Sequence, residues 1–461
     1  METTESVESK QLTRKEKFFF GIADMPTNII WSTTSTYLLY FLTDIYMIPV
    51  IAAGTLMLIT RFIDAAIDPF IGHVVDRINT KLGKARPFLL WFAFPLALSG
   101  CFLFLTPDFS DTGKIIYAYA LYILFVIFYS LVGVPYNAMM TLMTKNRKER
   151  AQLSSSRLIF ALIGGVLVSF IPLAVNILGS GENELQVQRT GYFNVAIIIG
   201  IFVIVGYLLT FFFTKEHFKD AEENTSKSSF GSALRAVAKN GPFFLLTGLN
   251  IVGSLRLGLL SGLVIYFVKH ALGLTDTFLT IMLMTFFICM IIGAIFGPKY
   301  FAWTDYKKGN IYLAIAGILG SVILMIDPTN LIFIFIFLVI NGLAQGVGNM
   351  SGYPMYGDVV EYGHWKTGIR SQGLIFSSFT LCQQISAGLG AFLISIVLSV
   401  TGYTAAAAVQ TPQTVNGIMI AFVGLPVLLN IVRIVMYCFY KIDKKMYKQI
   451  IAELEERNVS V

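Results

Sequence analysis

GYFNVAIIIGIFVIVGYLLTFFF, residues 191–213, runs without a single charged side chain. About 20 consecutive apolar residues are enough for a helix to cross the hydrocarbon core of a bilayer. The run is followed by KEHFKDAEENTSKSSFGSALRAVAKN (215–240), the longest polar segment of the chain. Together these two stretches predict membrane spans in two sets, one on each side of residue 215.

The composition agrees with a chain that crosses a membrane many times. The chain has 461 residues, of which 56% are hydrophobic and 13% charged, and its mean hydropathy is +0.71. Soluble domains usually carry about 25% charged residues. We therefore expect a polytopic membrane protein rather than a soluble one.

Apolar stretches of about 20 residues predict twelve transmembrane helices and an all-α fold of two six-helix bundles. The expected spans lie near 17–43, 49–76, 87–106, 115–143, 153–178, 191–213, 242–268, 277–298, 309–326, 330–360, 371–400 and 415–440. The expected organisation is an N-tail (1–16), a first bundle (17–214), a central loop (215–241), a second bundle (242–441) and a C-tail (442–461). A weak internal repeat supports two halves, since GHVVDRINTKLGKARP (72–87) and GPKYFAWTDYKKGN (297–310) occupy corresponding loops.

The distribution of basic residues predicts the orientation. Most of the 34 Lys and Arg residues fall in the two tails and in the loops that follow even-numbered spans. By the positive-inside rule, both termini and the central loop are expected on the cytoplasmic side of a cell membrane. The net charge of +7 reflects this bias, so we expect lipid around the spans and no nucleic-acid partner. The cytoplasmic loops could also receive a soluble regulatory protein.

TRFIDAAIDPF (60–70) places two acids inside a predicted span. Asp64 and Asp68 are four residues apart and therefore share one face of a helix. Charges in hydrocarbon are costly, and two neighbouring carboxylates repel each other, which favours proton uptake by one of them. We expect a coupling site for H⁺ or Na⁺, whose occupancy would bias the conformation. The alternative is a structural ion-pair network with Arg61.

Further polar side chains interrupt other predicted spans. They occur in ADMPTNIIWSTTSTYLLY (23–40), SLVGVPYNAMM (130–140), NGLAQGVGNMSGYPMY (341–356) and CQQISAGLG (382–390), and Arg157 adds a guanidinium. Carboxylate, guanidinium, amide and aromatic groups together suit the hydroxyls and ring face of a sugar. The alternative is that these residues only pack helices together. The candidate sugar contacts are Asp24, Asn28, Tyr136, Asn137, Arg157, Asn349, Tyr353 and Gln384.

Five stretches in order resemble the glycoside–pentoside–hexuronide:cation symporters, the melibiose permease family of the major facilitator superfamily. They are RFIDAAIDP (61–69), GHVVDRINTKLGKARPFLL (72–90), GVPYNAM (133–139), RKERAQLSSSR (147–157) and GDVVEYGHWKTGIRSQG (357–373). The resemblance covers residues 16–450 and implies two bundles that rock about a central cavity.

The resemblance also implies roles for single residues. Asp64 and Asp68 match the cation-site aspartates, and Ser130 falls where the family places a hydroxyl ligand. Asp24 matches the sugar-binding acid, and Arg157 its basic partner. A cytoplasmic gate is implied for Asp76, Arg86, Asp358, Glu361 and Arg370.

The sequence departs from the melibiose permease pattern at four positions. Ile67 stands where the pattern has an asparagine, and Gly133 where it has an aspartate. Losing two polar groups near the cation site favours H⁺ over Na⁺. Asn137 replaces the tryptophan on which the sugar would stack, and Gln384 replaces a lysine.

The expected activity is cation-coupled symport of a sugar or glycoside. A neutral β-glycoside, pentoside or disaccharide is favoured, because Gln384 removes one cation that a hexuronide would need. A hexuronide symporter and a passive sugar uniporter are the alternatives. No nucleophile or metal-ligand constellation is visible, so we expect neither an enzyme nor a cofactor beyond the coupling ion.

Overall fold

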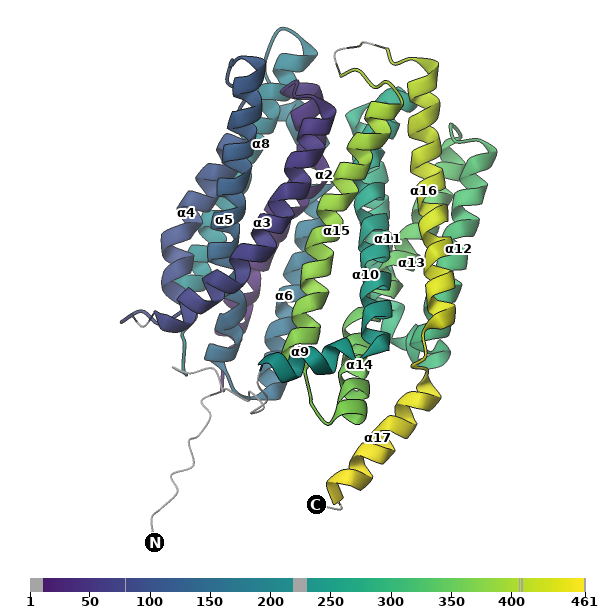
Figure 1. Cartoon of the computed structure of the whole chain (residues 1–461). Coiled ribbons are helices and arrows are strands. Elements are labelled where there is room, and N and C mark those ends of the chain that lie inside the picture. The colour runs from purple at the N-terminus through teal and green to yellow at the C-terminus, as the bar shows by residue number, and fades with distance from the viewer. Residues whose placement is uncertain (1–10, 79, 219–229, 406, 408, 460–461) are drawn as a thin grey trace. The chain divides into compact units, whose positions relative to one another are not determined.

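The computed structural model describes residues 11–78, 80–218, 230–405, 407 and 409–459, and all named elements in these ranges are helices (Figure 1). The elements that belong to residues 11–218 are α1 (Arg14–Ile22), α2 (Asp24–Tyr40), η1 (Phe41–Ile45), α3 (Val50–Arg77), α4 (Arg86–Leu103), α5 (Asp111–Met143), α6 (Arg147–Val168), α7 (Ile171–Leu178) and α8 (Glu184–Phe213). Those from residue 230 onward are α9 (Phe230–Ala238), α10 (Gly241–Tyr266), η2 (Phe267–Ala271), α11 (Asp276–Thr304), α12 (Tyr306–Ile326), α13 (Leu331–Asn349), α14 (Gly352–Thr367), α15 (Gln372–Val400), α16 (Pro412–Phe439) and α17 (Lys444–Val459). The elements η1 and η2 are single π-helical turns that extend α2 and α10.

The described residues contain ten helices that are long and apolar enough to cross a membrane. An eleventh span results if α6 and α7 are counted together, since they bend by 52° at a short break. The first expected span, 17–43, differs from the prediction because it is divided among α1, α2 and η1. Its middle part, α2, has only 17 residues and carries polar side chains along its length. The chain is thus a multi-pass membrane protein whose first helix is unusually polar.

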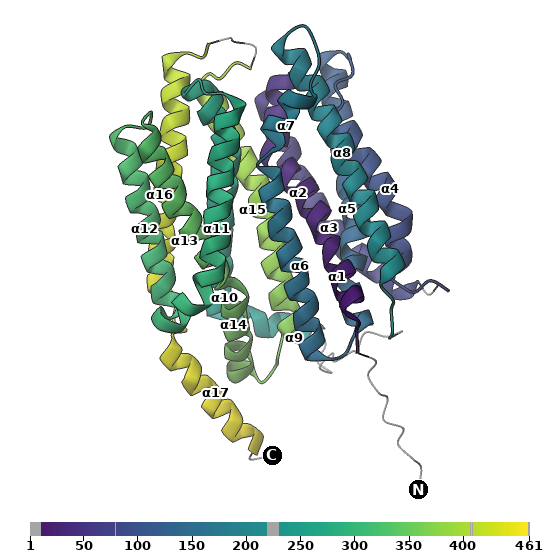
Figure 2. The same ribbon diagram turned by 180° about the vertical axis from the view of Figure 1, so that it is seen from behind.

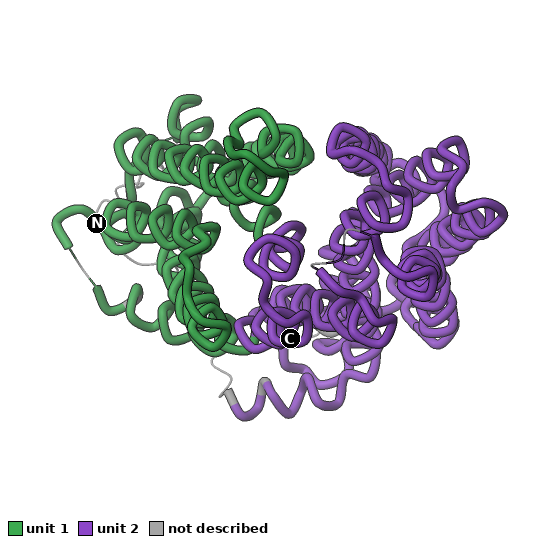
Figure 3. Tube along the Cα trace, turned by 90° about the horizontal axis from the view of Figure 1, so that it is seen from above, with its two compact units in different colours: residues 1–34, 62–223 green, residues 35–61, 224–461 purple. Residues whose placement is uncertain are grey.

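The chain forms two compact units (Figure 3). The first comprises residues 1–34 and 62–223, and the second comprises residues 35–61 and 224–461. The second unit therefore includes the end of α2, the turn η1 and the first part of α3. Helix α3 belongs to both units, because the boundary between the units falls inside it, between Arg61 and Phe62. The division into bundles at 17–214 and 242–441 stays a prediction.

In the first unit, α4 packs against α5 and α8, and α1 packs against α6 and α8 (Figure 2). Two glycines bring α1, α2 and α6 close together. A Cβ atom on Gly164 would lie 2.6 Å from the carbonyl oxygen of Met25, and one on Gly21 would overlap Ser156. Small residues allow helix backbones in membranes to approach in this way. The two contacts lie on either side of Arg157, so they fix the position of its side chain relative to α2.

In the second unit, α10 packs against α15 and α16, and α11 packs against α13. The first part of α3 lies on α15 through two glycines. A Cβ on Gly54 would overlap Ser395, and one on Gly388 would lie 3.0 Å from the carbonyl oxygen of Met57. Residues 50–61 are therefore held by backbone-to-backbone packing within this unit.

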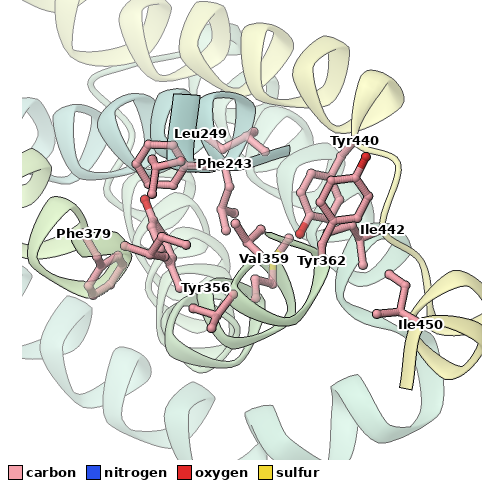
Figure 4. Close-up of a cluster of buried hydrophobic side chains, with 14 of the residues drawn as sticks. Phe243, Leu249, Tyr356, Val359, Tyr362, Phe379, Tyr440, Ile442 and Ile450 are labelled. Atoms are coloured by element: carbon pink, nitrogen blue, oxygen red, sulfur yellow. The ribbon is translucent and has the colours of Figure 1, made fainter. Parts of the chain in front are cut away.

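A buried apolar cluster packs several helices of the second unit together (Figure 4). It includes Phe243 of α10, Tyr356 and Val359 of α14 and Tyr440 after α16. The C-terminal helix α17 contributes Ile450. The C-tail thus contains a helix that is packed onto α14, where Trp365 Nε1 also donates a hydrogen bond to Glu453 Oε2 over 2.7 Å.

Candidate functional site

The first unit contains a buried ion pair between the start of α2 and the middle of α6. Arg157 donates to Asp24 with both Nε and Nη2, the latter 3.2 Å from Oδ1. Two parallel hydrogen bonds of this kind fix the orientation of both groups as well as their distance. Asp24 is the first residue of α2, where the helix dipole also favours a negative charge. The carboxylate is therefore held by charge, geometry and helix position together.

Tyr136 of α5 completes this pair. Its hydroxyl lies 2.8 Å from Asp24 Oδ2 and 2.6 Å from the carbonyl oxygen of Phe20. The Arg157 guanidinium carbon is 4.6 Å from the centre of the Tyr136 ring, which is a cation–π contact. Asp24, Tyr136 and Arg157, hereafter the ion-pair site, thus combine an aromatic ring, a carboxylate and a guanidinium, which are groups found in sugar-binding sites.

Two further predicted sugar contacts lie in the first unit. Asn28 is one helical turn after Asp24, and its Nδ2 donates to the Asp24 carbonyl over 3.0 Å. Asn137 is exposed, while its neighbour Tyr136 is buried. One residue along a helix is a rotation of about 100°, so these two side chains point in different directions. The structure therefore brings Asp24, Tyr136 and Arg157 into direct contact and leaves Asn137 outside that group.

The predicted cation residues lie further along α3 and α5. Asp64 is buried and accepts a hydrogen bond from Ser130 Oγ over 2.8 Å. Asp68 is half-buried one turn later. Ile67 packs with Ile71 and other apolar side chains in a small cluster between α3, α4 and α5. Position 67, where the melibiose permease pattern has an asparagine, therefore carries an apolar side chain next to Asp68 in this chain.

In the second unit, one of the predicted sugar contacts, Asn349, belongs to a chain of amides that begins at Arg256. Arg256 of α10 is only 2% exposed and donates to Asn341 Oδ1 over 2.9 Å. Its Nη2 donates to Gln345 Oε1, and Gln345 Nε2 in turn donates to Asn349 Oδ1 over 2.9 Å. Asn349 is a predicted sugar contact and is exposed. The chain of donors therefore leads from a buried guanidinium to an exposed amide.

The other two predicted contacts in this unit differ in exposure. Tyr353 is 61% exposed and lies against Phe379, with ring centres 4.9 Å apart and the ring planes tilted by 58°. Gln384 of α15 is half-buried. Arg256 itself was not among the predicted contacts. A charged residue inside an apolar helix is the signal that could have identified it.

The residues of the predicted cytoplasmic gate fall into separate groups. Arg370 pairs with Glu361 of α14, and Asp358 is one turn earlier on that helix. Arg86 begins α4, where Nη2 donates to the Phe211 carbonyl over 2.6 Å. The backbone of Asp76 belongs to α3, but its side chain lies outside the described residues.

A loop acid that the sequence did not single out stabilises the start of α4. The two carboxylate oxygens of Glu216 accept the backbone N–H groups of Lys84, Ala85 and Arg86 at 2.7–2.9 Å. Free N–H groups at a helix start attract such an anion. Glu216 therefore fastens the loop before α4 to the segment after α8.

Glu149, in the RKERAQLSSSR stretch, is a second acid whose contacts only the structure reveals. It accepts the Leu12 N–H and the Thr144 hydroxyl, each at 2.8 Å, and pairs with Lys17 at 3.2 Å. Burial opposes ionisation of this carboxyl, yet hydrogen bonds from Thr144, Leu12 and Lys17 outweigh it and lower the pKa of Glu149 below its usual value. The residue thus ties the chain before α1 to the start of α6 as a carboxylate.

An all-α, multi-pass chain with polar groups buried in its helices has the architecture of a membrane transporter. A solved structure of a bacterial homologue of the human lysosomal transporter Spinster, in an inward-facing conformation, shares this fold with a TM-score of 0.71. The match covers 93% of this chain and 97% of that chain at 14% identity.

The sequence comparisons then identify the family. The chain belongs to the family described as MFS/sugar transport protein, whose model matches residues 19–444, and within it to the glycoside–pentoside–hexuronide symporters. It is 34% identical to the uncharacterized symporter YnaJ of Bacillus subtilis, over 97% of this chain and 96% of that protein. It is 30% identical to the putative glycoside/cation symporter YagG of Escherichia coli, over 96% and 95% of the two chains. Identity to the isoprimeverose transporter of Lactiplantibacillus pentosus is 29%, over 96% and 91%.

Proposed function

We propose that this protein is a secondary active transporter that couples the movement of a sugar or glycoside to a cation by alternating access. The ion-pair site carries this proposal, because it combines a carboxylate, a guanidinium and an aromatic ring inside an apolar helical unit. The relatives named as a glycoside/cation symporter and an isoprimeverose transporter support the same class of activity. The polar groups described here serve binding, and the protein acts as a carrier rather than an enzyme.

The substrate is a neutral glycoside, pentoside or disaccharide. Arg157 already has a carboxylate partner in Asp24, so it has little charge left to offer an acidic sugar. Sugar hydroxyls, by contrast, can donate to Asp24 and accept from Arg157 at the same time. The buried Tyr136 side chain holds both groups in place through its hydroxyl and its ring face.

A hexuronide is the second candidate, and one observation favours it. Arg256 donates to the neutral amides of Asn341 and Gln345, so its positive charge is not balanced by these partners. A carboxylate on the substrate would supply the missing charge. Competition of uptake by neutral β-glycosides and by glucuronides, each at equal concentration, distinguishes the two candidates.

The coupling ion is H⁺, bound by Asp64 and Asp68, with Na⁺ as the alternative. Na⁺ requires several oxygen ligands, whereas one proton needs a single carboxylate. Ser130 offers one hydroxyl to Asp64, while Ile67 adds only apolar surface. Ion and sugar affinities must raise each other by the same factor, typically equivalent to about 1–3 kcal/mol.

The orientation in the membrane follows from the positive-inside rule. We place the protein in the cell membrane with both termini and the central loop in the cytoplasm. Lipid covers the apolar outer faces of the spans. A soluble regulatory protein would have access to the cytoplasmic loops.

Uptake into proteoliposomes tests the proposal. A panel of sugars is supplied under an imposed pH gradient and, separately, under an imposed Na⁺ gradient. Concentrative uptake under the pH gradient alone is expected, and Asp64→Asn and Asp68→Asn should each abolish it. Uptake that only equilibrates would identify a passive uniporter, and concentrative uptake by both variants would contradict the cation site.

A further inference from the structure

The two π-helical turns of the second unit carry similar sequences. Residues 40–44 read YFLTD and residues 266–270 read YFVKH, so Asp44 and His270 occupy equivalent places after a Tyr-Phe pair. The turns η1 and η2 follow α2 and α10 respectively, and Thr43 Oγ1 lies 2.9 Å from Tyr266 Oη. The side chains of η1 and η2 are thus in contact, and the Asp44 carboxylate faces the His270 imidazole.

Three ionisable groups converge at this contact. His270 Nε2 lies 3.1 Å from Asp44 Oδ1 and 2.8 Å from Tyr403 Oη. Tyr403, in the segment between α15 and α16, donates its hydroxyl to the same Oδ1 atom. Thr43 donates to the other carboxylate oxygen, Oδ2, over 2.6 Å. We call Asp44, His270 and Tyr403 the turn cluster.

Counting donors shows that the turn cluster requires a proton on the acid–imidazole pair. The single hydroxyl proton of Tyr403 is used in its bond to Asp44. An unprotonated Nε2 facing a carboxylate oxygen would be two acceptors in contact, which is unfavourable. A proton must therefore lie between Nε2 and Oδ1, and a second proton on Nδ1 turns the contact into a charge-assisted hydrogen bond.

Among the described neighbours of Asp44, His270 is the basic side chain that contacts its carboxylate. Lys269, its neighbour in η2, points to Asp276 at the start of α11, with Nζ 2.9 Å from Oδ1. Residues 412–432 of α16, which also contacts η2, contain no ionisable side chain. The phenol groups of Tyr40 and Tyr266 also lie nearby.

Tyr403 is held as a neutral donor. Burial, and next the Asp44 carboxylate, raise the pKa of this phenol well above its ordinary value. The His270 side chain is 19% exposed, so protons can reach it from solvent. Histidine is the side chain whose ordinary pKa places its charge change between pH 5 and 8.

We propose that Asp44, His270 and Tyr403 form a proton-binding site, separate from Asp64 and Asp68, that fastens residues 35–61 to the rest of the second unit. This segment is continuous with the first unit at Thr34 and at Phe62. Protonation of His270 strengthens its bond to Asp44, so acidification favours the fastened state. By linkage, a lower pH stabilises the fastened state and a higher pH releases it.

The site has a use in the transport cycle, and this part rests on the proposed function. Alternating access requires contacts that form in one conformation and break in another. A fastening that weakens with rising pH lets residues 35–61 leave the second unit. The proton at the turn cluster thereby controls how often residues 35–61 separate from the rest of the second unit.

Hydrogen–deuterium exchange of the full-length protein in lipid nanodiscs tests the site without sugar or gradient. Peptides covering residues 35–48, 262–275 and 398–411 are compared at pH 5.5 and 8.0, after correction for the intrinsic exchange rate. The wild type should exchange more slowly at pH 5.5 than at pH 8.0, because the protonated site holds these segments together. His270→Gln should remove this pH dependence, and Asp44→Asn should do the same.

Two controls keep the result interpretable. His73→Gln replaces an exposed histidine of α3 and should keep the full pH dependence. Tyr403→Phe removes one hydroxyl and should raise exchange at both pH values while a pH dependence remains. Equal corrected exchange at both pH values in the wild type, or an unchanged pH dependence in His270→Gln, would overturn the proposal. Since no transport is measured, a failure here is distinct from a failure of the proposed symport.

Discussion

The two units bury arginines in different ways. Arg157 of the first unit faces a carboxylate, Asp24, through two hydrogen bonds. Arg256 of the second unit donates to the amide oxygens of Asn341 and Gln345. Both arginines donate hydrogen bonds, but only the first arrangement is balanced in charge, and the buried Arg256 Nε has no hydrogen-bond partner among the described residues. A buried arginine in this protein can therefore be hydrogen-bonded without being balanced in charge, and mutations can test the two effects independently.

Breaking the balanced pair should have the largest effect. Arg157→Ala or Asp24→Ala leaves a buried charge without its partner, which typically costs about 3–5 kcal/mol. Sugar uptake should fall by at least about 100-fold, because about 1.4 kcal/mol corresponds to a factor of ten. Lys308→Ala, at an exposed site, is the control for both assays. The double variant should be less destabilised than the sum of the single ones, and simple additivity in a thermal-denaturation cycle would argue against the pair.

Neutralising the unbalanced arginine should affect transport and stability in opposite ways. Arg256→Gln leaves only neutral amides behind, so no unpaired charge is created. We expect an unchanged or higher melting temperature together with reduced uptake. If the substrate carries a carboxylate, the loss of affinity should be greater for glucuronides than for neutral glycosides, by about tenfold or more. A melting temperature that falls as far as in Arg157→Ala would erase the contrast between the two sites.

The Asp64 carboxylate, whose partner Ser130 is neutral, should show an effect of intermediate size. Ser130→Ala removes the hydroxyl that donates to Asp64, and a hydrogen bond to a charged group is worth about 1.5–3 kcal/mol. Because this donor stabilises the ionised carboxylate, its loss should raise the apparent affinity for the coupling proton by about tenfold, with less effect on the maximal rate. Ser154→Ala, on the exposed face of α6, is the matched control. Ion dependence of uptake measures both, and equal affinities in the two variants would exclude Ser130 from the ion site.

The smallest effect is expected at Glu149, where backbone, hydroxyl and ammonium groups share one carboxylate. Its lowered pKa means that folding favours the ionised form. This contribution to stability is present above the ordinary glutamate pKa, about 4.3, and is lost as the pH falls through the lower value of the folded state. Glu149→Gln should flatten the melting temperature between pH 6 and pH 3.5, whereas the exposed Glu182→Gln should not. Parallel curves for wild type and Glu149→Gln would refute this assignment.

The sequence was sufficient for those features that depend on local pattern. Apolar runs located the long helices, and the family resemblance indicated Asp24 and Arg157, which the structure shows in direct contact. The first span was predicted less well, because its polar residues and the break at Ala23 divide it into separate elements.

Features that depend on distant partners could not be predicted in the same way. Asp44 meets residues 226 and 359 positions away, and Arg256 meets Asn341 at a separation of 85. No helical period relates such positions. Exposure was also beyond the sequence, since Tyr136 and Asn137 are neighbours in one motif yet only Tyr136 is buried.

The C-terminal helix has a practical consequence for handling the protein. Because Ile450 and Leu454 of α17 complete the apolar cluster around α14, a chain shortened at Asp443 would expose that cluster to water. Glu453 would also be lost as the acceptor for Trp365. Affinity tags and fluorescent fusions are therefore best attached beyond residue 461, and removal of the tail to aid crystallisation would promote aggregation instead.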